Sequence, residues 1–467
     1  MQREALSNSN LTYKFAFEKN FGELIKGDDE AKFQKFKLAS SSISYSQNAV
    51  DSELFGGTRA PSKSSKGNVE VSGNIKIGVD NTQFGFWALA LLGKYKFTKN
   101  FQGTKHKHSF TISKKALPSL QLEKSYAGSP VTYRTTGIKA NTMSIEFGGE
   151  GEVYATIDMI GKNDFFYPYR TNATFKKLAA AANLGTTELT FADLDKLDVN
   201  DVITIKKELT TPAQAYNVYD TAIKLTSVAS ISKNDFIDIE NAGAYQVKAV
   251  VGDIVYLSRG LEFAITNASK VSLVSQQVTI KSKDTTAKKI TIDEPLKTNL
   301  AITDGILTDD KTSQLSYGTT FEQFDVTIKS QDNSGISSTV EKATINFNNN
   351  AEGKRLIKDK GSLGKITDGK VSCTIEMDLV LDPENALLLE NAKNDTIFDL
   401  TLSAVNGKGD SISFVFAKGT LTPKSPSAES PGAVSVSLTY SPFEENNNEA
   451  VEIILINDNV TPYGISE

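Results

Sequence analysis

The sequence predicts a mainly β protein in which two similar β domains flank a smaller β module. Three observations carry this prediction: long runs of alternating apolar and polar residues, a stretch whose pattern recurs 302 positions later, and a central region of different composition. A period of two is typical of strands with one buried face. A chain of 467 residues is long enough for two or three domains.

The recurring pattern relates residues 42–93 to residues 344–395 without a gap. In both stretches a strand is followed by a long polar loop, a second strand and a short apolar helix. Ile43 aligns with Ile345, and Gly67 aligns with Gly369. Only nine of the 52 aligned positions are identical, so the shared order of elements carries the inference of a duplicated domain.

Composition excludes several classes of protein. A net charge of −5 argues against a nucleic-acid-coating protein, which normally shows a basic excess. The single cysteine, Cys373, excludes an internal disulfide framework, and we expect it to be a buried thiol. The N-terminal residues have no apolar run typical of a signal peptide, and no stretch approaches the ~20 apolar residues that span a bilayer. We therefore expect no membrane anchor and assembly in a cytoplasm.

The first half opens with two alternating segments, LTYKFAFEKNF and FQKFKLASSSISYS, which predict strands separated by a turn at residues 27–30. The apolar pattern then stops from residue 48 to residue 66, and a loop of the same length follows at residues 350–368. Long loops in compact domains are uncommon and usually functional. A passive flexible loop is the plain alternative, but the equal lengths favour an arm that becomes ordered on assembly.

Each loop leads into a long alternating strand, NVEVSGNIKIGVD and KVSCTIEMDLVLD, and each strand ends at an aspartate. We predict that Asp80 and Asp382 are helix N-caps, because Pro383 occupies a favoured first helical position. Trp87 lies on the first of these helices, where we expect a role in core packing.

The only two histidines, His106 and His108, lie two residues apart, so on a strand they would face the same way. No third ligand accompanies them, which favours a solvated basic edge over a metal site. Both halves then close with further strand patterns, although the second half lacks a clear counterpart of PSLQLEKSY.

The central region contains a smaller repeat, since residues 189–205 are echoed by residues 225–239 with an Asn-Asp turn in each. We therefore place the domain boundaries at residues 1–168, 169–305 and 306–467, with the small β module in the middle.

Residues 42–93, with ALPSLQLEKSY, TGIKANTMSIEF and GEVYATIDMIG after them, resemble phage major tail tube proteins of the long, non-contractile type. The second half fits the same pattern at VEKATINFNNN, GKVSCTIEMDLVLD and VEIILIND. The resemblance covers roughly two thirds of the chain and lies in the order of the motifs. It implies two tandem β sandwich or barrel domains, each with a short flanking helix.

The resemblance further implies a structural virion protein that polymerises as stacked rings around phage DNA. Two domains per chain imply three chains per pseudo-hexameric ring, since single-domain relatives form hexamers. Implied partners are further copies of the chain, the tape measure protein and DNA in the lumen, and the tail terminator and distal tail proteins. Candidate ring-stacking residues in the two loops are Asn48, Glu53, Arg59, Lys63, Lys66, Asn350, Arg355, Lys358, Lys365 and Asp368.

Other functions are less well supported by the sequence. It has no Gly-rich phosphate loop, no nucleophile elbow and no histidine base near a nucleophile, so we predict no enzyme, no cofactor and no metal. A tail hub or terminator, which would stop at one ring, is the nearest alternative. A cell-surface adhesive protein would need export.

Overall fold

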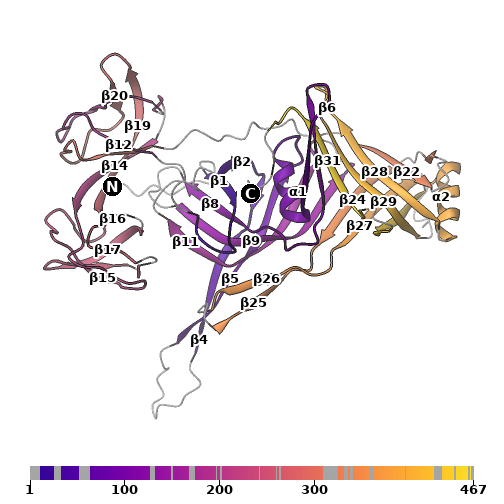
Figure 1. Ribbon diagram of the computed structural model, residues 1–467, viewed down its shortest axis with the longest axis horizontal. Helices are drawn as coiled ribbons and strands as arrows, with labels where there is room; N and C mark the ends of the chain where they lie inside the picture. Colours follow the sequence, from indigo (N-terminus) through magenta and orange to yellow (C-terminus); the bar gives the residue numbers. More distant parts are fainter. Residues whose placement is uncertain are drawn as a thin grey trace, which may run out of the picture.

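The computed structural model of the chain is built almost entirely from antiparallel β strands, and its described residues include two short helices (Figure 1). The predicted mainly β class is confirmed. The structure describes residues 11–25, 33–51, 64–126, 132–148, 151–167, 174–195, 197–199, 202–240, 242–258, 260–261, 264–308, 324–330, 335–336, 340–357, 361–394, 396–424, 434–445, 449–460 and 463.

We call residues 11–167 the first half, 174–308 the middle module and 324–463 the second half. The first half contains β1 (Leu11–Phe17), β2 (Gln34–Phe36), β3 (Ser40–Ser41), β4 (Ser44–Val50), β5 (Ser65–Gly78), α1 (Phe84–Leu92), β6 (Gly93–Gln102), β7 (Lys105–Ile112), β8 (Leu120–Tyr126), β9 (Thr132–Phe147), β10 (Tyr154–Gly161) and β11 (Asn163–Tyr167).

The second half contains β22 (Asp325–Ser330), β23 (Gly335–Ile336), β24 (Val340–Asn348), β25 (Glu352–Arg355), β26 (Leu363–Thr367), β27 (Ser372–Val380), α2 (Pro383–Lys393), β28 (Ile397–Val405), β29 (Ser411–Pro423), β30 (Ser435–Pro442) and β31 (Glu452–Asn457). One large cluster of buried apolar side chains runs through both halves.

The strand pairings of the first half recur in the second half in the same order. β9 pairs with β8, β10 and β11, and β29 pairs with β28, β30 and β31. β8 pairs with β1 as β28 pairs with β22, and β5 joins β4 to β10 as β27 joins β24 to β30. β28 therefore occupies the position of β8, the strand for which the sequence offered no clear counterpart.

Two features interrupt this correspondence. The hairpin formed by β6 and β7 follows α1, whereas α2 leads directly to β28. The second feature is the segment that was predicted as a long loop in each half, because it contains paired strands and differs between the halves. β4 and β5 extend the first one into a hairpin arm, with Val50 paired to Ser65, and the second contains the β25–β26 hairpin. Cross-strand pairing shortens both loops because the flanking backbone can continue its hydrogen-bonded ladder.

The middle module has a sheet of its own and two separate apolar cores. Its strands are β12 (Thr174–Lys177), β13 (Glu188–Thr190), β14 (Val202–Thr210), β15 (Ala222–Lys224), β16 (Phe236–Ile239), β17 (Gly243–Val251), β18 (Ile254–Leu257), β19 (Val271–Asp284), β20 (Lys289–Ile292) and β21 (Gly305–Thr308). In Figure 1 the module lies on the side of the first half that faces away from the second half.

The small repeat expected in the module coincides with a repeated pairing pattern. β13 pairs with β20, which pairs with β19, which pairs with β14. In the same way β15 pairs with β18, β18 with β17 and β17 with β16. The second unit lies between β14 and β19 of the first, so one unit is inserted into a hairpin of the other.

Candidate assembly face and edges

The two halves are joined by a continuous sheet. β24 of the second half pairs antiparallel with β9 of the first half, from Ala343 opposite Phe147 to Asn348 opposite Thr142. The resulting order of strands is β4, β5, β10, β9, β24, β27, β30 and the end of β29. We call the β9–β24 pairing the inner seam.

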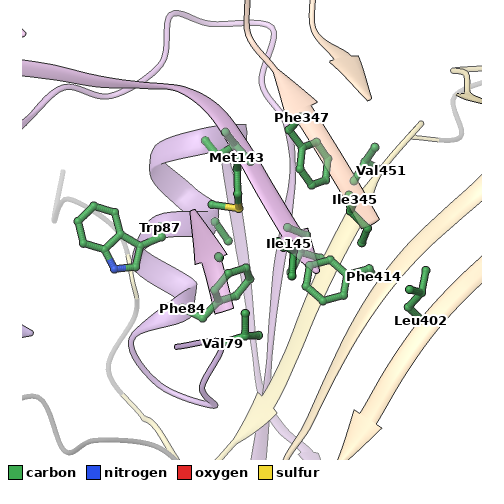
Figure 2. Close-up of a cluster of buried hydrophobic side chains, with 14 of the residues drawn as sticks. Val79, Phe84, Trp87, Met143, Ile145, Ile345, Phe347, Leu402, Phe414 and Val451 are labelled. Atoms are coloured by element: carbon green, nitrogen blue, oxygen red, sulfur yellow. The ribbon is translucent and has the colours of Figure 1, made fainter. Parts of the chain in front are cut away.

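One face of this sheet is apolar and buried. Met143 and Ile145 of β9 lie beside Ile345 and Phe347 of β24, all at most 2% exposed, and α1 covers β9 (Figure 2). Asn349, which follows β24, donates from its Nδ2 to the carbonyl oxygens of Leu91 at 3.0 Å and Ala140 at 3.1 Å. The second half therefore helps to anchor the end of α1.

The opposite face of the sheet is polar along its whole width. One row of directly paired residues crosses five strands and consists of Lys76, Thr156, Ser144, Asn346 and Thr374. The next row continues with Glu146, Thr344, Glu376 and Thr439. Period-two alternation in every strand places these side chains together, away from the core.

The polar face carries both acidic and basic groups. Its carboxylates are Glu70, Glu146, Asp158, Glu376 and Asp378, and its described cations include Lys66, Lys76, Lys139 and Lys342, while Arg355 of the β25–β26 hairpin lies 3.8 Å from Glu70. Hydroxyl groups hold two of the carboxylates, since Thr142 Oγ1 donates to Asp158 at 2.7 Å and Ser437 Oγ donates to Asp378 at 2.6 Å. Neutral donors leave the negative charge of a carboxylate in place, so these two carboxylates stay charged.

Among the residues that the structure describes, both ends of the continuous sheet are edges. Among the described residues, β3 and β4 pair only with β5. Six of the seven residues of β4 are exposed, including Tyr45 at 42% and Val50 at 55%. At the other end, β29 ends at Pro423, and proline within sheets is confined to edges and strand ends. Unpaired edges invite pairing with another strand.

The two halves also pair at a second place. The β6–β7 hairpin of the first half pairs with β31 near the end of the chain, from Thr111 opposite Glu452 to His106 opposite Asn457. We call this pairing the outer seam. Tyr463 follows it and is fully buried, with its ring 4.7 Å from that of Phe86 on α1.

The histidines lie in the outer seam, so the expected solvated basic edge is wrong. His106 is 3% exposed and His108 is 0% exposed. His108 Nε2 lies 3.1 Å from both Asn457 Oδ1 and Asn459 O and must donate, while its Nδ1 accepts from the Tyr95 hydroxyl at 2.8 Å. Burial lowers the pKa of His108 to about 4, so the ring is neutral at pH 7.

The candidate stacking residues fall in two different settings. Asn48 and Lys66 are exposed on the projecting β4–β5 arm, and Asn350 and Lys365 are exposed in the second loop. Glu53, Arg59, Lys63 and Lys358 lie outside the described residues.

The other two candidates contact the first half of the same chain. Arg355 Nη1 donates to Val69 O of β5 at 2.7 Å, and Val69 N donates to Gly361 O at 3.0 Å. Asp368 pairs with Lys139 at 2.8 Å and accepts from the backbone N–H of Leu117 at 2.9 Å. The β25–β26 hairpin is thereby pinned along the base of β5 (Figure 1).

The two predicted N-caps have different roles. Asp382 is the N-cap of α2 and accepts from the N–H of Asn385 at 2.7 Å. Asp80 is not the N-cap of α1, because the helix begins at Phe84 and Gln83 occupies that position. The Asp80 carboxylate instead accepts from the backbone N–H groups of Thr82, Gln83 and Phe84, which orders the turn before the helix. Burial raises the pKa of Asp80.

The described residues contain no cluster of three or more His, Cys, Asp or Glu side chains that could hold a metal ion. Cys373 is partly buried, and burial raises the pKa of its thiol. Neither helix in the described part of the chain is long and apolar enough to cross a bilayer.

Sequence reasoning missed both seams. The residues that form them, such as Phe347, Asn349 and His108, read as ordinary strand and loop residues. The only available signal was the length of the alternating strands, which required neighbouring strands without identifying them.

Comparison with known families agrees with this architecture. A family model described as phage tail tube protein matches residues 8–229 and 301–442, well over half of the chain. A search of curated proteins found no match. The chain thus belongs to the phage tail tube protein family and is a structural component of the virion tail.

Proposed function

We propose that the chain is the tube subunit itself: three copies close into a ring, and rings stack into the channel through which DNA passes. The observation that carries this proposal is the continuous sheet that crosses both halves and ends in an open edge on each side. A head-to-tail interface that closes on itself gives a ring and leaves no edge unpaired.

The recurrence of strand pairings in the two halves supports a ring of three chains. This recurrence supports two copies of one tube domain, at residues 1–168 and 306–467, with the module of residues 169–305 between them. Six domains, two from each chain, then surround the channel with pseudo-sixfold symmetry. The seam between chains would then have the same strand pairing as the inner seam within the chain.

The polar face of the sheet is suited to line the channel. Its other face is covered by the core and α1, so in a closed ring the polar face is the one left to water. Carboxylates such as Glu146 and Glu376 repel DNA phosphates. The hydroxyl groups of the face bind water, so a layer of water separates the wall from the nucleic acid. A channel wall of this kind lets DNA and the tape measure protein pass without binding them tightly.

Stacking of rings is assigned to the arms. The β4–β5 arm projects from the body (Figure 1), and an isolated two-stranded ribbon is marginally stable in water without a partner. The middle module lies away from the second half and would project outward from the tube. The ends of the tube would meet the tail terminator and the distal tail proteins.

Negative-stain electron microscopy of the purified full chain tests the proposal. We expect hollow tubes of stacked rings, with three chains in each ring by mass measurement of ring fragments. A tail hub or terminator would stop at a single ring, and a stable monomer at all concentrations would contradict the proposal. Deletion of residues 58–65 tests the arm, and we expect folded rings that do not stack.

A further inference from the structure

The inner seam allows the unseen seam between chains to be derived residue by residue. The position of this second seam rests on the proposed ring. Two features of the chain define it: the strand pairings recur in both halves, and β5 and β27 share the 302-residue offset, so that Gly78 and Val380 end the two strands at equivalent positions.

The registers give the residue of β29 that corresponds to the inner seam. In the first half, Asn74 pairs with Asp158, and Asp158 pairs with Thr142. The residue equivalent to Asn74 is Glu376, which pairs with Thr439, which in turn pairs with Thr422. Thr422 of β29 therefore occupies the position of Thr142 of β9.

The same offset gives the residue on the opposite edge. Thr142 pairs with Asn348 of β24 across the inner seam, and the equivalent of Asn348 in the first half is Ser46 of β4. Met143 pairs with Phe347 across the same seam, and the equivalents of these two residues are Pro423 and Tyr45.

We propose that β4 of one copy pairs antiparallel with the end of β29 of a second copy, with Ser46 opposite Thr422 and Tyr45 opposite Pro423. The occupant of the open edge is thus another copy of this chain, in one specified register.

The exposure of the edge agrees with this assignment. Phe347 is 2% exposed because β9 covers it across the inner seam, whereas its equivalent Tyr45 is 42% exposed. Ser46 and Thr422, like Asn348 and Thr142, are polar and belong to the polar face. A second copy placed in this register would therefore bury the aromatic ring and continue the polar face without a break.

Pro423 adds a feature that the inner seam lacks. Proline has no backbone N–H, so the pairing between chains has one donor fewer at this position than the pairing at Met143. A proline at an exposed edge also blocks indiscriminate strand addition. We therefore expect the seam between chains to form only together with the other contacts of the ring.

Disulfide trapping tests the register. In a full chain carrying Cys373→Ala, we would assemble two double variants, Ser46→Cys with Thr422→Cys and Tyr45→Cys with Pro423→Cys, and oxidise them. Two adjacent pairs are used because directly opposite residues alternate between two Cα separations, of about 5.5 and 4.5 Å. Both separations are compatible with a disulfide.

We expect covalent multimers up to a trimer on a non-reducing gel. Thr142→Cys with Asn348→Cys is the matched control, which should cross-link within one chain and migrate as a monomer. Ser44→Cys with Thr422→Cys is displaced by two residues and should not cross-link. If tubes formed but chains were cross-linked only in the displaced variant, or in no variant, the register would be wrong and the proposed function would stand. Absence of rings and tubes from the reduced proteins would overturn both.

Discussion

The two halves of the chain share one set of strand pairings but differ in how completely they are covered. In the first half, every residue of α1 is buried. In the second half, Leu387 of α2 is 54% exposed. At the equivalent position of α1 stands Gly85, where an added Cβ would lie 2.7 Å from the ring of Tyr463. The end of the second half therefore covers the helix of the first, and a glycine makes room for it.

The arms show a related difference. The arm of the second half folds back and is pinned to Val69 of β5 by Arg355, whereas the β4–β5 arm of the first half projects beyond this contact (Figure 1). The second half thus uses its arm within the chain, against β5. In the proposed ring, a neighbouring chain would supply the contacts that the first half lacks.

The largest expected effect comes from breaking the inner seam. Ile345→Asp places a carboxylate in a fully buried position opposite Ile145, and we expect a loss of more than about 4 kcal/mol in the free energy of unfolding. Urea denaturation followed by circular dichroism measures it. Thr344→Ser, on the polar face of the same strand, should change stability by less than about 0.5 kcal/mol. Equal midpoints for the two variants would show that the seam contributes nothing.

The outer seam should weaken in acid because of His108. Its pKa is about 4 in the folded chain and about 6.5 when exposed, so between these values the unfolded chain binds a proton that the folded chain does not. Stability is full above about pH 6.5 and falls as the pH drops towards 4, by about 3 kcal/mol at most. Denaturation of wild-type chain and His108→Gln across this range isolates the effect. The variant should lose this part of the pH dependence, and parallel curves would contradict the prediction.

Gly85 and Leu387 provide a test of the helix comparison. Gly85→Ala should cost about 1–3 kcal/mol, although alanine favours helices, because its methyl group meets Tyr463. Leu387→Ala, at the equivalent exposed position, should cost less than about 0.5 kcal/mol in the monomer. Thermal unfolding of both variants measures these two costs. A stabilised Gly85→Ala chain would show that Tyr463 does not cover α1.

The smallest effect concerns the pinned arm. Arg355→Ala removes the donors to Val69 O and Gly361 O, with an expected cost of about 1 kcal/mol. Hydrogen exchange of residues 352–367 should speed up several-fold, while the rest of the chain is unchanged. Lys354→Ala alters only an exposed pair with Glu352 and is the control. If the two variants exchanged alike, Arg355 would not hold the hairpin.

Sequence patterns predicted the strands and helices well where the signal is local. Alternation located β5 and β27, and the Asp-Pro pair located the start of α2. The Asp80 N-cap prediction failed because Asp80 lies four residues before Phe84, where the helix starts, and its carboxylate binds the turn before α1. His106 and His108 were misplaced because their exposure depends on β31, which lies more than 340 residues away in the chain.

The sequence alone determined that this protein is mainly β, and which residues of the alternating strands face a core, because side-chain alternation and capping are properties of neighbouring residues. Only the tertiary structure decided that β24 joins β9, that Tyr463 covers α1, and that one arm folds back while the other projects. Those choices depend on contacts between distant segments, and any apolar strand edge can in principle accept many partners.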